Sequence, residues 1–489
     1  MGEITTIAAP VKGWNTVASI ANIPPDMAIV LDNLIPSTAS VSSRKGYSSH
    51  ATGVGSGNVD SLFELKALSV NKMVAAASGA LYDVTSVGAA TSLATGFASN
   101  QWQGAVFNAV LGLVNGTDAP QTYDGTTVTA MTVSGAGLTV TNLSSIHVFK
   151  NRTYFTENAK QGFWYSALST MGDVLTFFPL GRVGNFGGNL VAIQTLTKDG
   201  GAGQDDAICF FMSSGEIIVY EGTNPASDFI LTGVFKTGRP IGPRSIVKLG
   251  PDIMFVTNEG YLTVSSLLPL SFGKDNGKIN EFIKGAASDA VSANPTGFGW
   301  QVCVSPSNNI LLVNVPGSDG TIVQHVLNVN TIAWCRFTGI DARCWATYGN
   351  DLYFGSTNGT VYLYGPEYTD DGTQVTGVYQ SPYLSFNKGG QSRTTAVRPR
   401  ARMDGSLTMT VKTSVDFKPF SLPYTVSYTF IGAMWGDPWG SPWATTNSVI
   451  NYLSMNSVGY DISVSLTFTT GGLVDYFETN FLSQLCGRI

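Results

Sequence analysis

The stretch Leu352–Tyr364, LYFGSTNGTVYLY, carries the clearest structural signal in this chain of 489 residues. Apolar residues alternate with polar ones on both sides of Asn358-Gly359. Asn-Gly favours a type I′ turn, because that turn needs a positive φ at both central positions. The stretch therefore predicts a tight β-hairpin.

Related stretches recur along the chain. Three close copies and three looser ones begin at Met73, Phe210 and Met254, and at Leu111, Arg152 and Ile310. Successive starts lie roughly 40 to 60 residues apart, which is typical of four-stranded propeller blades. A β-helix would repeat at a shorter period, and a pair of β-sandwiches has no reason for regular spacing. The pattern predicts an all-β fold with a closed β-propeller of six or seven blades.

Changes in composition and in the hairpin pattern divide the chain into three regions. We expect an extended N-terminal arm over residues 1–59, the propeller over 60–375 and a second, smaller all-β domain over 376–489. In the third region, Ser392–Phe417 reads as two strands around Asp404-Gly405.

Helical signals are sparse. Lys278–Asn294 combines good helix formers with apolar residues near helical spacing, which predicts a short helix inserted between blades.

The composition excludes several classes of protein. Charged residues make up only 12% of the chain and the net charge is −6, which argues against a general nucleic-acid-binding protein. The sequence shows neither a signal peptide nor an apolar run of the roughly 18–20 residues that span a bilayer. The 5 cysteines include no CxxC pair, so we expect neither a disulfide framework nor a zinc site. We expect the chain to fold in a reducing compartment.

Candidate catalytic groups are few. The three histidines, His50, His147 and His325, stand apart from other ligand-type residues in the sequence. The acidic pairs Asp205-Asp206 and Asp370-Asp371 could serve glycoside hydrolysis, but each sits in a Gly-rich stretch where Asp is common in turns. The sequence predicts no catalytic, cofactor-binding or metal-binding residue, and therefore no enzyme.

Arg398, Arg400 and Arg402 are spaced by two, so a strand would place all three side chains on one face. The row is either a solvated strand face or a contact with carboxylates of a neighbouring chain, since planar bidentate pairing favours arginine. We predict the second, because three like charges side by side repel one another.

Trp435, Trp439 and Trp443 cluster in the Pro/Gly-rich stretch MWGDPWGSPW. They form either a small core under a loop or an interface anchor, because Trp is enriched at binding hot spots. They join the arginine row as candidate interface residues.

The segment Gly13–Tyr47 has a Gly-Trp-Asn start, a Pro-Pro-Asp step, an Asp-Asn followed by Pro, and a basic residue before Gly-Tyr. In these features it resembles the N-terminal signature of the tail nozzle (tail tubular B-like) structural proteins of short-tailed bacteriophages. The likeness continues through NGTDAPQTYDG (Asn115–Gly125), the long stretch Thr197–Ser227, GRPIGPRS (Gly238–Ser245), FGWQ (Phe298–Gln301), AWCRFTGIDARCWA (Ala333–Ala346) and YFGSTNGTVY.

The resemblance implies a virion tail protein that is assembled in the cytoplasm of a host bacterium. Such proteins form a closed homo-oligomeric ring, typically a hexamer, below the portal and the adaptor (head-to-tail connector). The ring conducts DNA without binding it specifically and serves as a platform for tail fibres or spikes. An alternative is a virion-associated propeller that binds or cleaves a host-surface glycan.

The resemblance also suggests a role for the N-terminal arm. Through Arg44 and Lys45, the arm would bind a neighbouring subunit or the adaptor ring. It could equally close the propeller by adding an outer strand.

Overall fold

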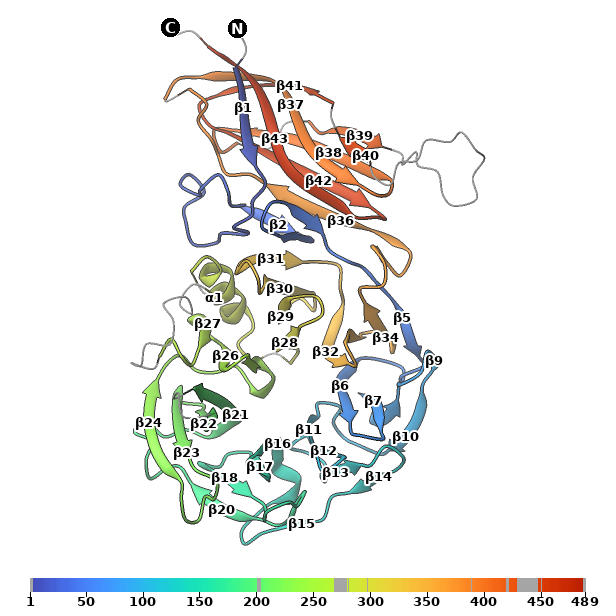
Figure 1. Ribbon diagram of the computed structural model, residues 1–489, viewed down its shortest axis with the longest axis vertical. Coiled ribbons are helices and arrows are strands. Elements are labelled where there is room, and N and C mark those ends of the chain that lie inside the picture. The colour runs from blue at the N-terminus through green and yellow to red at the C-terminus, as the bar shows by residue number, and fades with distance from the viewer. Residues whose placement is uncertain are drawn as a thin grey trace.

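The fold is described from a computed structural model of the chain. The structure describes residues 3–199, 204–267, 279, 281–296, 298–387, 389–418, 422–428, 447–449 and 451–486. Figure 1 shows a ring of small sheets with a β-sandwich at one end of it.

The ring is a β-propeller, as predicted, and seven antiparallel sheets form it in the described residues. The strands of each sheet are given in pairing order. The first sheet contains β6 (Val59–Lys66), β7 (Asn71–Ala77), β8 (Ala80–Asp83) and β10 (Thr91–Thr95), and the second contains β11 (Gln103–Phe107), β12 (Val110–Val114), β13 (Gln121–Tyr123) and β14 (Val128–Ala130). The third contains β16 (Leu143–Phe149), β17 (Arg152–Glu157), β18 (Gly162–Tyr165) and β20 (Thr176–Pro179), and the fourth contains β21 (Leu190–Asp199), β22 (Gln204–Met212), β23 (Glu216–Glu221) and β24 (Ile230–Lys236). The other three are β25 (Ile246–Leu249), β26 (Asp252–Thr257), β27 (Gly260–Thr263); β28 (Gln301–Ser305), β29 (Ile310–Pro316), β30 (Ile322–Asn328), β31 (Ala333–Phe337); and β32 (Ala342–Tyr348), β33 (Asp351–Ser356), β34 (Val361–Tyr364), β5 (Tyr47–Thr52). Short elements complete the ring: β9 (Gly88–Ala89), β15 (Val133–Ser134), β19 (Asp173–Val174), β35 (Thr369–Asp370), and the 3-10 turns η1 (Val140–Asn142) and η2 (Pro243–Ser245).

Each of the seven predicted hairpins forms two adjacent strands of a different sheet, from β7–β8 to β33–β34. The turn type predicted for Asn358-Gly359 is wrong. Only Gly359 has a positive φ, 72°, because four residues rather than two separate β33 from β34. The turn between β16 and β17 does have two positive φ values, 44° at Lys150 and 61° at Asn151.

The N-terminal segment is not an extended arm, because its strands belong to both parts of the molecule. β1 (Glu3–Ala8) and the hairpin β3 (Leu34–Pro36)–β4 (Val41–Ser43) join the sandwich by pairing with β43. β2 (Val30–Asp32) pairs with β36 of the sandwich and with β31 of the propeller. β5 is the outer strand of the seventh sheet and so closes the ring, the second of the two arrangements expected.

The sandwich has two layers. One contains β36 (Thr373–Gln380), β42 (Ile462–Thr470), β38 (Leu407–Val415) and β39 (Tyr424–Tyr428); the other contains β43 (Val474–Leu485), β37 (Ser392–Met403), β41 (Leu453–Gly459) and β40 (Asn447–Val449), together with β1, β3 and β4. Tyr476 of one layer packs against Tyr379 and Phe468 of the other. Ser392–Phe417 contains two strands, as predicted, but they lie in different layers and form no hairpin. The domain begins at Thr373, slightly before the predicted boundary.

The predicted helix is α1 (Lys284–Ala293), which lies between β27 and β28 and begins later than expected. Its buried residues Ala287 and Val291 pack in one cluster with Met254 and Trp334. No helix in the described part of the chain is long and apolar enough to cross a membrane.

Candidate functional site

Arg44 lies between the propeller and the sandwich, directly after β4, and its side chain is only 1% exposed. Its two Nη atoms donate to both carboxylate oxygens of Asp370, at 2.7 and 2.6 Å, and its Nε donates to Oδ1 of Asn33 at 2.8 Å. The remaining donors reach the carbonyl oxygens of Lys45, at 2.9 Å, and Thr338, at 3.2 Å. All five N–H groups of the guanidinium therefore have acceptors within the chain.

This geometry corrects the prediction for Arg44. A buried and fully hydrogen-bonded guanidinium is not available to a neighbouring subunit or to the adaptor. Lys45, the other predicted residue of the pair, is exposed.

Asp32 and Asn33 hold the same junction. Arg336 of β31 donates to both carboxylate oxygens of Asp32, at 2.7 Å each. The Nδ2 of Asn33 donates to Oγ1 of Thr338 at 2.9 Å and to the carbonyl oxygen of Thr376 in the sandwich at 2.8 Å. Asn33 has a φ of 55°, a conformation that Asn tolerates better than most residues. We call Asp32, Asn33, Arg44, Arg336, Thr338 and Asp370 the interdomain joint.

Two glycines of the N-terminal segment make close approaches near the joint. A Cβ on Gly46 would lie 1.9 Å from the carbonyl oxygen of Thr369. Gly13 has a φ of 81°, and a Cβ there would lie 2.5 Å from the carbonyl oxygen of Trp334. The next residue, Trp14, lies under the Arg336 guanidinium with its ring centroid 5.4 Å away. The segment that carries the family resemblance therefore supplies three residues of the joint, Asp32, Asn33 and Arg44, and residues that pack beside it.

A second polar cluster ties the propeller blades together near the ring's centre. Arg244 of η2 donates to the carbonyl oxygens of Asp60 at 2.7 Å and Trp102 at 3.0 Å, and to the hydroxyl of Ser61 at 2.5 Å. Asp60 and Ser61 belong to β6, and Trp102 precedes β11. One side chain thus links the fifth sheet to the first and second.

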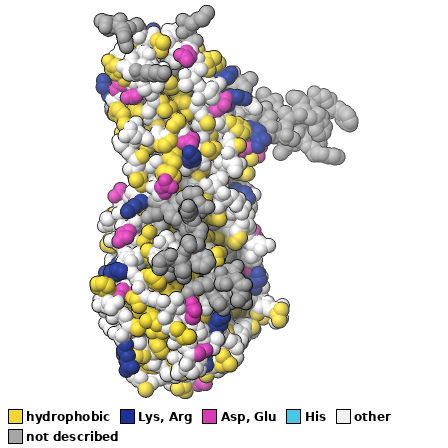
Figure 2. All heavy atoms as spheres, turned by 60° about the vertical axis from the view of Figure 1, so that its left-hand side comes forward, with side chains coloured by type: hydrophobic (Ala, Val, Ile, Leu, Met, Phe, Trp, Pro, Cys, Tyr) yellow, Lys and Arg dark blue, Asp and Glu magenta, His cyan; other side chains and the backbone are white. Residues whose placement is uncertain are grey.

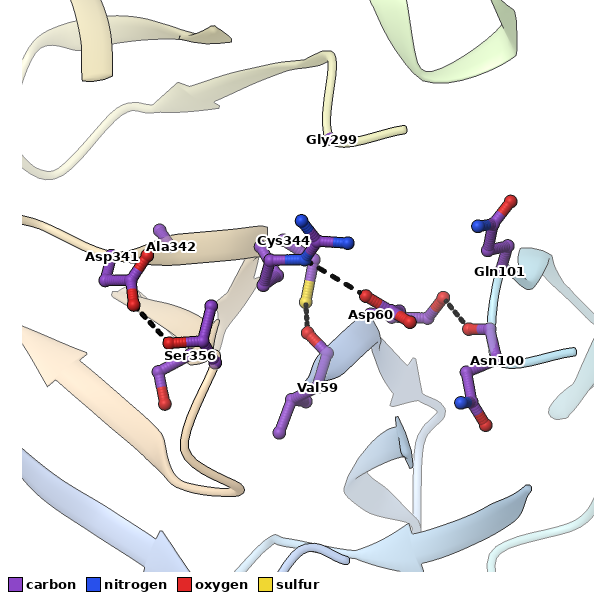
Figure 3. A network of polar contacts seen from close by, with 12 residues as sticks. Val59, Asp60, Asn100, Gln101, Gly299, Asp341, Ala342, Cys344 and Ser356 are labelled. Carbon is purple, nitrogen blue, oxygen red and sulfur yellow. Dashed lines mark hydrogen bonds and ion pairs between the residues drawn. The ribbon is translucent and has the colours of Figure 1, made fainter. Parts of the chain in front are cut away.

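Arg343 of β32 completes this cluster. Its Nε donates to Oδ1 of Asp60 at 3.2 Å, and Figure 3 shows Asp60 facing the neighbouring blade that carries Cys344. The ring of Phe298 lies against both guanidinium groups, 4.8 Å from Arg244 and 5.4 Å from Arg343. We call Asp60, Ser61, Arg244, Phe298 and Arg343 the hub.

Burial shifts the pKa values in the hub. It raises the pKa of the Asp60 carboxyl above its ordinary value, against the lowering effect of Arg343, and it lowers the pKa of the Arg244 guanidinium. It also raises the pKa of the Cys344 thiol to about 12, so that this thiol is uncharged at neutral pH. The Cys344 thiol donates to the carbonyl oxygen of Val59 at 3.2 Å, a contact that Figure 3 shows.

Asp60 and the two hub arginines were not among the predicted site residues. A signal for the arginines was present, because each lies inside a motif of the family resemblance in a chain with few charges: Arg244 in GRPIGPRS and Arg343 in AWCRFTGIDARCWA. Asp370, the partner of Arg44, was predicted as a turn residue.

The arginine row lies on one strand, β37, and one face of it, as predicted. Its carboxylate partners lie within the same chain, on the adjacent strand β43. Arg400 pairs with Glu478 at 2.7 Å and Arg402 with Asp475 at 2.5 Å, while the Arg398 guanidinium lies 4.7 Å from the ring centroid of Tyr452. The inference from this row to a neighbouring subunit therefore loses its basis, because β43 already supplies carboxylates.

The other candidates have plain places in the fold. Trp435, Trp439 and Trp443 lie outside the described residues. Asp205 and Asp206 lie in β22 rather than in a turn, whereas Asp371 has the φ of 47° that suits a turn. His50, His147 and His325 lie on three different blades, and no group of three metal-ligand side chains gathers anywhere in the described residues.

On the face shown in Figure 2, basic and acidic side chains are scattered among uncharged ones over both parts of the molecule. This distribution agrees with the low charge content, and the described residues visible on that face form no basic tract for holding nucleic-acid phosphates.

Comparisons with known proteins show distant similarity to solved structures only. No protein-family model and no curated protein match the chain. Among solved structures, the chain is similar to BBS1N in its complex with ARL6DN, with 11% identity and a TM-score of 0.41 over 66% of this chain and 96% of that chain. It is also similar to Raptor of Chaetomium thermophilum, with 10% identity and a TM-score of 0.41 over 66% of this chain and 29% of that chain.

Proposed function

We propose that this chain is a structural subunit of a short-tailed bacteriophage tail. Several copies, six by the family resemblance, form a closed ring that follows the portal and the adaptor, conducts DNA and holds tail fibres or spikes. The proposal assigns the chain no catalytic role.

One observation carries the proposal. The residues that make the N-terminal segment resemble the nozzle family also build the interdomain joint, with Arg44, Asp32 and Asn33 at its centre. They fix the propeller to the sandwich through two bidentate pairs, a buried one at Arg44 and a half-buried one at Arg336. A rigid two-part unit suits a building block of a pressurised conduit.

The hub bears on where DNA would run. Arg244 joins blades across the ring, so the channel in this proposal lies between subunits and not along the axis of one propeller. The negative net charge supports passage, because each additional phosphate contact would add salt-dependent affinity and slow the DNA.

The glycan-cleaving alternative has less support. A glycoside hydrolase needs two carboxyl groups roughly 5–10 Å apart. A cavity adjoins the hub, and the described residues that line it include no Asp or Glu.

Negative-stain microscopy and light scattering test the proposal on the purified chain, alone and mixed with phage tails that lack it. We expect rings of uniform copy number that attach to the adaptor end of the tails. A chain that stays monomeric and leaves the tails unchanged would contradict the proposal.

A further inference from the structure

The cavity beside the hub has features of a ligand site. Its volume is about 260 Å³, which suits a ligand of about the size of a sugar acid or a sugar phosphate. Arg244, Phe298 and Trp300 form one part of its lining, and Gln101 and Gln103 form another. These residues come from loops and strands of different blades, so the folded ring creates the cavity.

The hub carries more positive than negative charge. The groups that act electrostatically on Arg244 are Asp60, Arg343 and Cys344, and the Cys344 thiol is uncharged at neutral pH because burial raises its pKa to about 12. Two guanidinium groups thus share one carboxylate. Arg343 and Asp60 are 20% and 13% exposed, and an excess charge in such surroundings is costly unless a counter-charge is nearby.

Hydrogen-bond donors remain available around the excess charge. Arg343 donates only its Nε to Asp60 among the bonds of the described residues, which leaves its Nη groups. Gln101 and Gln103 line the cavity, and neither side chain makes a hydrogen bond within the described part of the chain. In Figure 3 the Gln101 side chain points to the side of the network on which Gly299 lies, and Gly299 is another residue of the lining.

We propose that this cavity binds a small molecule that carries a carboxylate or a phosphate group. The anionic group would lie against Arg244 and neutralise the excess charge of the hub, since guanidinium groups bind both oxyanions well. The glutamine amides would bind the polar remainder of the ligand. This inference is independent of ring assembly, because every residue it uses lies in one propeller.

Isothermal titration calorimetry with three probes tests the binding and separates the two sources of the anion. Glucuronate supplies a carboxylate, glucose 1-phosphate supplies a phosphate, and glucose is the neutral control. We expect saturable binding of at least one acidic probe, weakened by added salt, and no binding of glucose at the same concentrations. Absence of binding by both acidic probes up to about 20 mM, or equal binding of glucose, would overturn the proposal.

Variants locate the site. Gln101→Glu places a negative charge at an exposed position of the lining without removing a hub contact, and we expect it to weaken acidic-probe binding about tenfold or more. Arg343→Gln removes the excess charge and should have a similar effect. Arg400→Gln removes an arginine of the sandwich instead and is the matched control, with affinity unchanged. Wild-type affinity in Gln101→Glu would show that the probe binds elsewhere and would refute the assignment.

Discussion

The interdomain joint and the arginine row use the same chemistry in different surroundings. In each, arginines pair with carboxylates from a distant part of the same chain. The Arg44 side chain is 1% exposed and links the propeller to the sandwich, whereas Arg400 is 54% exposed and links two adjacent strands of one sheet. Loss of a partner should be costly at the joint, where the remaining charge stays buried, and nearly neutral in the row, where water replaces the partner. The burial of an ion pair therefore determines how much the free energy of unfolding falls when one partner is lost.

The largest effect is expected at Arg44. Arg44→Met would leave the Asp370 carboxylate without its bidentate partner and lower the free energy of unfolding by about 3–5 kcal/mol. Urea denaturation measures this. The double variant with Asp370→Leu should recover much of the loss, because it removes the unpaired charge as well.

Lys45→Met is the matched control, since Lys45 is the exposed neighbour of Arg44 and its loss should change stability by less than about 0.5 kcal/mol. Equal effects of the two single substitutions would remove the distinction between a buried and an exposed basic residue at this position.

Acid should destabilise the propeller through His325, which lies on β30. Burial lowers the pKa of His325 from 6.5 to about 3, with a further lowering by Arg336. The unfolded chain binds this proton near pH 6.5 and the folded chain does not, so the stability is present above pH 6.5 and is lost as the pH falls toward 3.

Between pH 7 and pH 5 this one group should cost about 2 kcal/mol. Urea denaturation at both pH values, compared between the wild type and His325→Asn, measures the contribution. The variant loses the hydrogen bond to the Tyr261 hydroxyl and should be less stable at pH 7, but with a flatter pH dependence. An equally steep pH dependence in the variant would contradict the assignment.

Asp32 and Arg336 provide an intermediate case, because Arg336 is 33% exposed and Asp32 13%. Arg336→Gln should cost about 1–2 kcal/mol, between the values typical of buried and surface pairs. A double-mutant cycle with Asp32→Asn isolates the coupling. A coupling energy near zero would mean that the Asp32–Arg336 pair adds nothing to the stability of the joint.

The smallest effect is expected at Arg400. Arg400→Gln should change the free energy of unfolding by less than about 1 kcal/mol and leave the oligomeric state unchanged. Light scattering on this variant sharpens the comparison. A weakened assembly would show that the row contacts another subunit in addition to β43.

Much of the architecture could be predicted because it depends on local patterns. Each propeller hairpin is visible in the sequence as alternating apolar and polar residues on both sides of a turn. The spacing of the hairpins corresponds to the length of one blade. The turn type at Asn358-Gly359 could not be read from the dipeptide, because the loop length depends on where β33 and β34 stop pairing.

The candidate site was harder to predict, because its geometry depends on contacts between residues far apart in the chain. The spacing of Arg398, Arg400 and Arg402 correctly placed them on one face, but nothing local reveals that β43 lies beside them. Arg44 and Asp370 are likewise brought together only when both parts of the molecule have folded. The spacing of residues in the sequence predicts which face of a strand they share. Their partners on neighbouring strands are known only once the fold is known.

The strand pairing of the N-terminal segment has a consequence for the order of events during synthesis. β5 completes a sheet with β34, and β1 pairs with β43, so both early strands need partners that the ribosome makes much later. A chain emerging from its N-terminus can form the first blades at once, but neither the ring nor the sandwich can close until the late strands appear. During that interval β1 and β5 present unpaired edges to the surrounding solution, and newly made chains are then most exposed to wrong pairing with one another.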